Sequence, residues 1–218
     1  VFDYQACKMN DNNTLITVTG YGDFPYLEQL TVNFARSKLI DDVGIQNLTG
    51  SLYPMELKSI NLTMNLCPDI TDHGLVLYVD SVAHYKRLEV FALAMNGCKK
   101  ITDEGFSYLT KMLSAHPHLE ILKLQFENCN QITNKGLESL RDALTKLINL
   151  KRVTFHFGNN DKIGDAGLMA LRDGLINLQA LDCFELKLQS CIQITDLGIK
   201  YLKEGMVNLN RIVNMELD

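Results

Sequence analysis

The sequence lacks an excess of basic residues. Its 218 residues include 21 Lys and Arg against 26 Asp and Glu, which gives a formal net charge of −5. The chain as a whole therefore does not attract a polyanion or an anionic lipid surface, and we expect neither nucleic acid nor a membrane among its partners.

Long apolar runs are also missing. No stretch approaches the ~18 consecutive apolar residues that a membrane-spanning helix needs, and the first residues show no secretory leader. With 46% hydrophobic and 22% charged residues, the composition is that of a globular domain large enough to bury its own core. Because the chain begins at Val1 and its last residues start a repeat that they do not finish, we expect it to belong to a longer protein.

Motifs that carry catalysis are absent as well. The sequence has no Gly-rich phosphate loop, no serine elbow and no His-Glu-x-x-His helix. His116 and His118 form the only close pair of histidines, without an acid or thiol at ligand spacing, so we expect His116 to be a partly buried ring with one hydrogen-bond partner. We predict no catalytic residue, no metal, no cofactor and no small-molecule substrate, and therefore no enzyme.

The sequence does contain a repeat with a period of about 31 residues. The string Ile-x-Asp/Asn-x-Gly-apolar occurs six times, at residues 40–45, 70–75, 101–106, 132–137, 163–168 and 194–199. Its glycines are separated by 30 residues once and by 31 residues four times. A fixed period of this length is typical of a solenoid, in which similar coils stack on one another.

Each repeat changes its apolar period within itself. Leu122, Leu124 and Phe126 alternate, which predicts one buried face of a short strand. From 137 to 147 the leucines follow helical spacing, and Thr133 can cap the start of that helix. Each coil therefore contains one strand and one helix.

Stacking such coils predicts an α/β solenoid of the right-handed horseshoe type. Strands about 4.8 Å apart would form a parallel sheet on the concave face, and the wider helices would cover the convex face. We expect residues 24–218 to form about six coils plus a final strand, and residues 1–23 to form a degenerate N-terminal repeat or cap.

On these motifs the sequence resembles the leucine-rich repeat family, in particular its cysteine-containing class. The Cys-x-x-Ile-Thr-Asp pattern, once with Asn in last place, stands at residues 67–72, 98–103, 129–134 and 191–196, while Asn160 and Ser37 replace the cysteine in two other coils. F-box substrate receptors carry repeats of this class. The Gly-Asp-Ala-Gly-Leu string at 164–168 is similar to the ribonuclease-inhibitor and Ran GTPase-activating-protein class.

Two columns of polar residues leave a metal-binding alternative open. Four of the six cysteines, Cys67, Cys98, Cys129 and Cys191, share one position of the repeat. Zinc ligands normally come as close pairs in one loop, and parallel side chains are poorly aimed for disulfides, so we interpret these as buried, reduced thiols. Reduced thiols favour an intracellular, cytoplasmic location.

The second column consists of carboxylates, one in most coils, and could suggest calcium. Its members are Asp42, Asp72, Asp103, Asp165 and Asp196. Calcium loops supply several oxygens from one short segment, whereas here each coil supplies one beside a helix start. We therefore interpret the column as stabilising the positive ends of the helices.

The exposed positions of the predicted strands form the candidate binding surface. Small apolar residues occupy its middle and mainly basic residues its margin, a pattern that favours a protein-binding patch, although a sheet face also tolerates small apolar residues without a partner. The predicted partner-binding residues are Val90, Ala92, Ala94, Ile121, Lys123, Gln125, Arg152, Thr154, His156, Glu185 and Lys187.

These observations predict a non-catalytic module that binds a protein partner on its concave sheet and acts as a scaffold or adaptor within a larger assembly. The family resemblance implies two alternatives. The chain could be the substrate receptor of an F-box-type ubiquitin ligase, which needs an F-box not visible in residues 1–23. It could also regulate a small GTPase.

Overall fold

The structure is a computed structural model that describes residues 27–37, 40–52, 56–207, 209, 211–212 and 214–217. The predicted N-terminal repeat or cap at residues 1–23 lies outside this part. The described strands are β1 (Gln29–Asn33), β2 (Ser59–Thr63), β3 (Val90–Ala94), β4 (Ile121–Gln125), β5 (Arg152–His156), β6 (Cys183–Lys187) and β7 (Asn214–Leu217). The described helices are α1 (Asp42–Leu52), α2 (Asp72–Val82), α3 (Asp103–Leu113), α4 (Asn134–Leu144), α5 (Asp165–Leu175) and α6 (Asp196–Met206).

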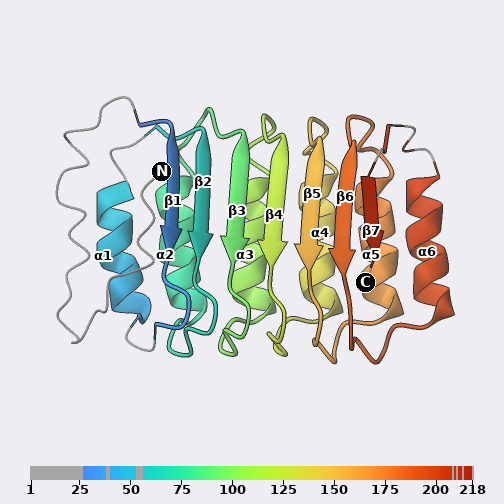
Figure 1. Cartoon of the computed structure of the whole chain (residues 1–218), viewed down its shortest axis with the longest axis horizontal. Helices are drawn as coiled ribbons and strands as arrows, with labels where there is room; N and C mark the ends of the chain where they lie inside the picture. Colours follow the sequence, from blue (N-terminus) through green and yellow to red (C-terminus); the bar gives the residue numbers. More distant parts are fainter. Residues whose placement is uncertain are drawn as a thin grey trace.

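The strands form one parallel sheet in which each strand pairs with the next one in the sequence. The order is β1 to β7 without a crossover, and the helices lie in a second layer behind the sheet (Figure 1). The register places Leu93 beside Leu124, Leu124 beside Phe155, and Phe155 beside Leu186. The predicted α/β solenoid is confirmed, with the parallel sheet on one face and the helices on the other.

The core lies between the sheet and the helices. Leu122 and Leu124 of β4 and the following Phe126 have no more than 1% of their surface exposed, as the alternation predicted. The Phe106 ring of α3 packs edge-on against Phe126, with ring centroids 5.1 Å apart. An additional inward residue after each strand, such as Phe126, therefore fills the space between one coil and the next.

The helix starts are capped as predicted. Thr102 has an extended backbone, and its hydroxyl accepts a hydrogen bond from the Glu104 N–H. The same contact is made by Thr71, Thr133 and Thr195. In α5 the capping position is Gly164, which offers no side chain.

The carboxylate column does more than face the helix ends, because four of its five carboxylates also bind the next coil. Asp72 accepts hydrogen bonds from the Thr102 N–H at 2.8 Å and from the Thr102 hydroxyl at 2.6 Å. The other pairs of this kind are Asp42 with Thr71, Asp103 with Thr133, and Asp165 with Thr195. We call this set the aspartate ladder.

One step of the aspartate ladder is altered on both sides at once. Where Gly164 replaces threonine, the preceding coil has Asn134 instead of aspartate, and its amide oxygen accepts from the Gly164 N–H at 2.9 Å. Gly164 lacks the hydroxyl that threonine would donate, and Asn134 lacks the second carboxylate oxygen that would accept it. Because both groups are absent, no hydrogen-bonding group is left without its partner at this step.

The repeated glycine makes room for this ladder. A Cβ atom at Gly105 would overlap the Asp72 carboxylate, and one at Gly198 would overlap that of Asp165. Glycine at this position therefore allows the carboxylate of one coil to reach the helix start of the next.

The turn after each strand contains a left-handed residue that the sequence analysis did not identify. The residues with positive φ are Arg36, Leu66, Gly97, Asn128, Asn159 and Ser190, with φ between 56° and 76°. Only Gly97 adopts this conformation without steric cost from a Cβ atom.

Four cysteines of the described chain follow directly on these turns as free, buried thiols. Cys98 donates its S–H to the Met64 carbonyl at 3.1 Å, and Cys129 donates to the Met95 carbonyl at 3.2 Å. Burial raises the pKa of the Cys129 thiol to about 12, so the group stays protonated. The predicted buried thiols are confirmed, with the carbonyl of the preceding coil as their partner.

Asn160 performs the same task where the cysteine is missing. Its side chain is wholly buried and donates to the Phe126 carbonyl at 2.8 Å, the place that a cysteine would take. It also donates to the Phe157 carbonyl at 2.8 Å and accepts from the Cys129 N–H at 2.7 Å.

Candidate functional site

The solvent-facing side of β3 to β6 carries all eleven predicted partner-binding residues. Arg152 is exposed, whereas Val90, Ile121, Lys123, Gln125, Thr154, Glu185 and Lys187 are half-buried. Val90 and Ile121 are direct partners in the register of β3 and β4. The structure therefore brings the apolar and basic members together on one surface, which we call the sheet face.

Three of these residues differ from the expectation that they project into solvent. Ala92, Ala94 and His156 are exposed by only 8%, 5% and 7%. Each alanine has longer side chains beside it on both neighbouring strands, with Lys123 next to Ala92 and Gln125 next to Ala94. The alanines thus form a recessed strip, and the exposed apolar surface is that of Val90 and Ile121.

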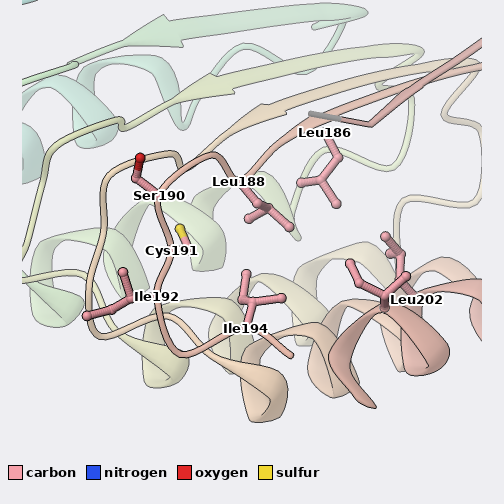
Figure 2. Close-up of a pocket in the computed structure, with 8 residues that line it drawn as sticks. Leu186, Leu188, Ser190, Cys191, Ile192, Ile194 and Leu202 are labelled. Atoms are coloured by element: carbon pink, nitrogen blue, oxygen red, sulfur yellow. The ribbon is translucent and has the colours of Figure 1, made fainter. Parts of the chain in front are cut away.

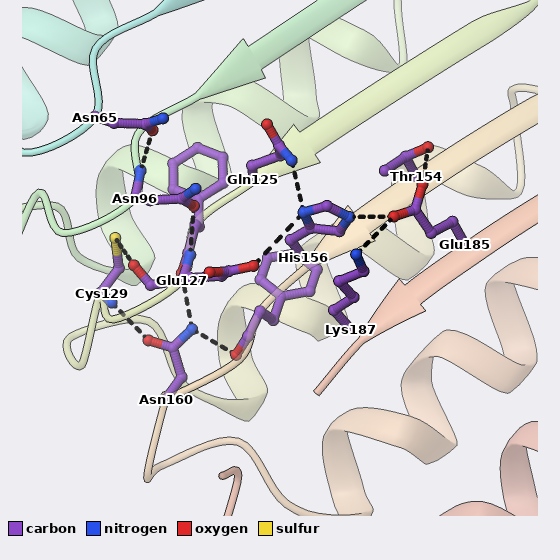
Figure 3. A network of polar contacts seen from close by, with 12 residues as sticks. Asn65, Asn96, Gln125, Glu127, Cys129, Thr154, His156, Asn160, Glu185 and Lys187 are labelled. Carbon is purple, nitrogen blue, oxygen red and sulfur yellow. Dashed lines mark hydrogen bonds and ion pairs between the residues drawn. The ribbon is translucent and has the colours of Figure 1, made fainter. Parts of the chain in front are cut away.

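His156 is buried because polar side chains from neighbouring coils surround it (Figure 3). Its Nε2 lies 2.7 Å from Glu185 Oε1, and its Nδ1 lies 2.6 Å from Gln125 Nε2. Because the amide nitrogen can only donate, this geometry assigns the ring proton to Nε2, which donates to Glu185. Glu127 Oε1 stands 3.5 Å from Nδ1.

Glu185 is the centre of this network. Its second oxygen accepts from the Thr154 hydroxyl at 3.3 Å, and Lys187 Nζ lies 3.3 Å from Oε1. Partial burial disfavours the charged carboxylate, but the hydrogen bonds from His156 and Lys187 and the positive charge of Lys187 outweigh it, so the pKa of Glu185 is lowered. The acid remains ionised and holds three side chains of the sheet face in place.

A second polar column runs beside the ends of the strands. The Asn65 side chain accepts from the Asn96 N–H, and the Asn96 side chain accepts from the Glu127 N–H, both at 2.8 Å (Figure 3). The sequence analysis did not identify this column. Asparagine at the same position of two successive coils, Asn65 and Asn96, is the signal that could have found it.

The alternative metal sites gain no support in the described part of the chain, where no group of three or more His, Cys, Asp or Glu is arranged to hold a metal ion. His116 is 4% exposed, and its Nδ1 donates to the Met112 carbonyl at 2.9 Å. The predicted single hydrogen-bond partner is confirmed, and the ring is buried more fully than the predicted partial burial. Burial lowers the pKa of His116.

An apolar pocket lies on the open side of the last coil (Figure 2). Its lining residues are Leu186, Leu188, Ser190, Cys191, Ile192, Ile194, Ile199 and Leu202. Ile199 is 37% exposed, although the equivalent Leu168 is wholly buried. The two positions differ because, among the described helices, none packs on the outer side of α6. Ile192, at the rim, is 77% exposed.

Comparison with known proteins agrees with this repeat architecture. A family model described as "Leucine Rich repeat" matches residues 115–140 and 153–171, which lie in the coils of β4 and β5. These two segments are leucine-rich repeats, and the other described coils share their strand and helix. The comparison does not confirm the likeness to F-box receptors or to the Ran GTPase-activating-protein class, and no curated protein matches the chain.

Two solved structures share the leucine-rich repeat fold. One is described as "Leiomodin-1 Actin-Binding Site 2 (ABS2)", with a TM-score of 0.50 and 20% sequence identity over 74% of this chain and 87% of that chain. The other is a tropomodulin C-terminal domain from Caenorhabditis elegans, with a TM-score of 0.50 and 16% identity over 74% of this chain and 92% of that one. At these identities the likeness concerns the fold.

Leucine-rich repeat domains generally bind other proteins, so binding of a protein partner is the function that this fold favours. No helix in the described ranges is both long and apolar enough to cross a membrane. On the sheet face and at the apolar pocket of the last coil, several apolar side chains that reach solvent lie next to one another.

Proposed function

We propose that this leucine-rich repeat chain is a non-catalytic protein-interaction module that binds its partner on the sheet face and serves as a scaffold or adaptor within a larger assembly. One observation supports this most directly. Val90 and Ile121, two half-buried aliphatic side chains, lie beside each other in the register and adjoin the basic Lys123 and Arg152. An apolar centre with a polar margin is the usual composition of a protein-binding patch.

The chemistry of the sheet face also fits binding better than catalysis. The buried His156 donates to Glu185, whose charge is further held by Lys187, so these groups neutralise one another. A general base needs an accessible nitrogen, whereas both ring nitrogens of His156 already have neighbours within 2.7 Å.

The proposal is tested by placing charge in the apolar centre. We expect Val90→Asp together with Ile121→Asp to abolish capture of partner proteins by the immobilised chain, because burying two carboxylates in the interface is costly. Both side chains are half-buried, so helical content and thermal melting should stay close to those of the original chain. Captured proteins are identified and compared by quantitative mass spectrometry.

The matched control is Ile148→Asp, which adds the same charge at a residue that is 56% exposed and outside the sheet face. It should leave capture unchanged. Unaltered capture by the Val90 and Ile121 variant would contradict the proposal. Loss of capture by Ile192→Asp alone would instead place the binding surface at the apolar pocket of the last coil.

More specific roles are suggested by the comparisons and by the cysteine motif. One similar structure is an actin-binding site of leiomodin-1, so co-sedimentation with filamentous actin is a direct first assay. An F-box in the full-length sequence would support the ubiquitin-ligase alternative. Accelerated GTP hydrolysis by a purified small GTPase in the presence of the chain would support the GTPase alternative.

A further inference from the structure

The side chains of the sheet face form a grid whose rows cross the strands. The register places Val90, Ile121 and Arg152 in one row, and Lys123 lies in the next row, two residues further along β4. With strands about 4.8 Å apart and a rise of about 3.3 Å per residue, the Cα atoms of Lys123 and Arg152 are about 8 Å apart. Both cationic side chains can therefore reach one group held above Ile121.

Lys123 and Arg152 also differ from the other charged side chains of the sheet face. Lys187 lies 3.3 Å from Glu185, which in turn accepts from His156. Neither Lys123 nor Arg152 has an ion pair with any described residue. These are two neighbouring cations without a counter-ion, at the centre of a chain whose net charge is −5.

The edge where the strands begin carries charges of both signs. Each of six successive coils has one charged residue there, in the order Glu28, Lys58, Glu89, Glu120, Lys151 and Asp182. The two lysines pair with Glu28 and Glu120, and Lys86 and Arg87 line the same hollow as Glu89. This edge is therefore not a basic track for a long polyanion, whereas the two cations Lys123 and Arg152 suffice for a single carboxylate above Ile121.

Aliphatic surface adjoins the two cations. Val90 and Ile121 lie half-buried in one row, and Ala92 and Ala94 leave a shallow recess beside them. In an extended peptide, alternate side chains point to the same side and are about 7 Å apart. This spacing matches the distance between a carboxylate held by Lys123 and an aliphatic side chain placed on Val90.

We propose that the sheet face binds an extended segment of a partner protein in which an Asp or Glu lies within two residues of a Val, Leu or Ile. The carboxylate would contact Lys123 and Arg152, and the aliphatic side chain would cover Val90 and Ile121. This inference rests on the proposed function, since it names the partner chemistry of the same surface.

The test uses random dodecapeptides displayed on phage and selected on the immobilised chain. Enriched sequences are resynthesised with a fluorophore, and their affinities are measured by anisotropy. We expect acidic residues beside aliphatic ones, and a loss of affinity of about tenfold or more in the double variant Lys123→Glu, Arg152→Glu. Added salt should weaken binding to the original chain, because the contact is partly ionic.

The control variant Lys99→Glu, Lys146→Glu makes the same change in net charge at two exposed lysines outside the sheet face. Its affinity should remain within about twofold of the original. Both double variants must keep the thermal melting of the original chain, which separates a binding effect from unfolding.

Three results would overturn the inference. Selected peptides that lack acidic residues, or that bind the Lys123 and Arg152 variant as tightly as the original chain, would refute the acidic chemistry. If Val90→Asp with Ile121→Asp still abolishes their binding, the proposed function stands. If only Ile192→Asp abolishes peptide binding, both the inference and the proposed function are refuted. A fluorescent single-stranded oligonucleotide that binds more tightly than every selected peptide would also refute the acidic partner.

Discussion

At the scale of single residues, side chains that look equivalent in the sequence perform different tasks according to their neighbours in the next coil. Asp103 accepts hydrogen bonds from the Thr133 N–H, the Thr133 hydroxyl and the Gly136 N–H. Asp196 occupies the same repeat position, is exposed, and has no hydrogen-bond partner among the described residues. The two residues therefore form a natural pair of test and control.

We expect Asp103→Ala to lower the free energy of unfolding by about 1–3 kcal/mol, because it leaves the Thr133 N–H and hydroxyl without their acceptor. Asp196→Ala should change stability by less than about 1 kcal/mol, since it removes only a charge at a helix start. Urea unfolding followed by circular dichroism measures both. Equal losses in the two variants would show that the aspartate ladder adds nothing beyond helix-end electrostatics.

At the scale of elements, the turn after each strand imposes a conformation that only some residues accept easily. Gly97 has φ +76°, and a Cβ atom there would lie 2.6 Å from Leu66 Cδ2 in the preceding coil. Gly50, inside α1, has no atom within 4 Å of the place that a Cβ would take. One glycine is thus required by its turn, and the other is not required by packing.

We expect Gly97→Ala to destabilise the chain by about 1–2 kcal/mol, through the left-handed backbone and the contact with Leu66. Gly50→Ala should stabilise it by up to about 1 kcal/mol, because alanine favours a helix interior. The melting temperatures of the two variants should move in opposite directions. A shift of the same sign in both would contradict this account of the turn.

At the scale of the whole molecule, the stack has one continuous core, so a group buried in one coil affects the stability of the stack around it. His116 is 4% exposed between α3 and β4, and burial lowers its pKa below the ordinary value of 6.5. As the pH falls to about 6.5, the unfolded chain binds a proton at His116, whereas the folded chain binds it only at lower pH. Folding is therefore disfavoured progressively as the pH falls below 6.5.

We expect the free energy of unfolding to decrease between pH 7 and pH 5, and His116→Leu to reduce this decrease. Leucine stands at the equivalent positions Leu147 and Leu178, both wholly buried, so the substitution suits the site. The control His118→Asn changes an exposed ring and should keep the original pH dependence. An unchanged pH dependence in the His116 variant would refute the role of this ring.

A second decrease is expected at lower pH. The pKa of Glu185 is lowered from 4.5 because its bonds to His156 and Lys187 outweigh its partial burial, and hydrogen bonds from Thr195 lower that of Asp165 from 3.8. Both carboxylates stabilise the folded chain above these ordinary values, and this contribution is lost as the pH falls through their folded values.

The 31-residue period was sufficient to predict which residues pair across strands, which ones fill the core and which threonines cap helices. It could do so because alternation and helical spacing place each side chain relative to its own backbone. Other features depend on side chains in the adjacent coil. They are the exposure of Ala92, His156 and Ile199 and the hydrogen-bond partners of Asp72 and Asn160. Those features were decided only by the tertiary structure, since contacts about 30 residues apart arise from stacking and not from local periodicity.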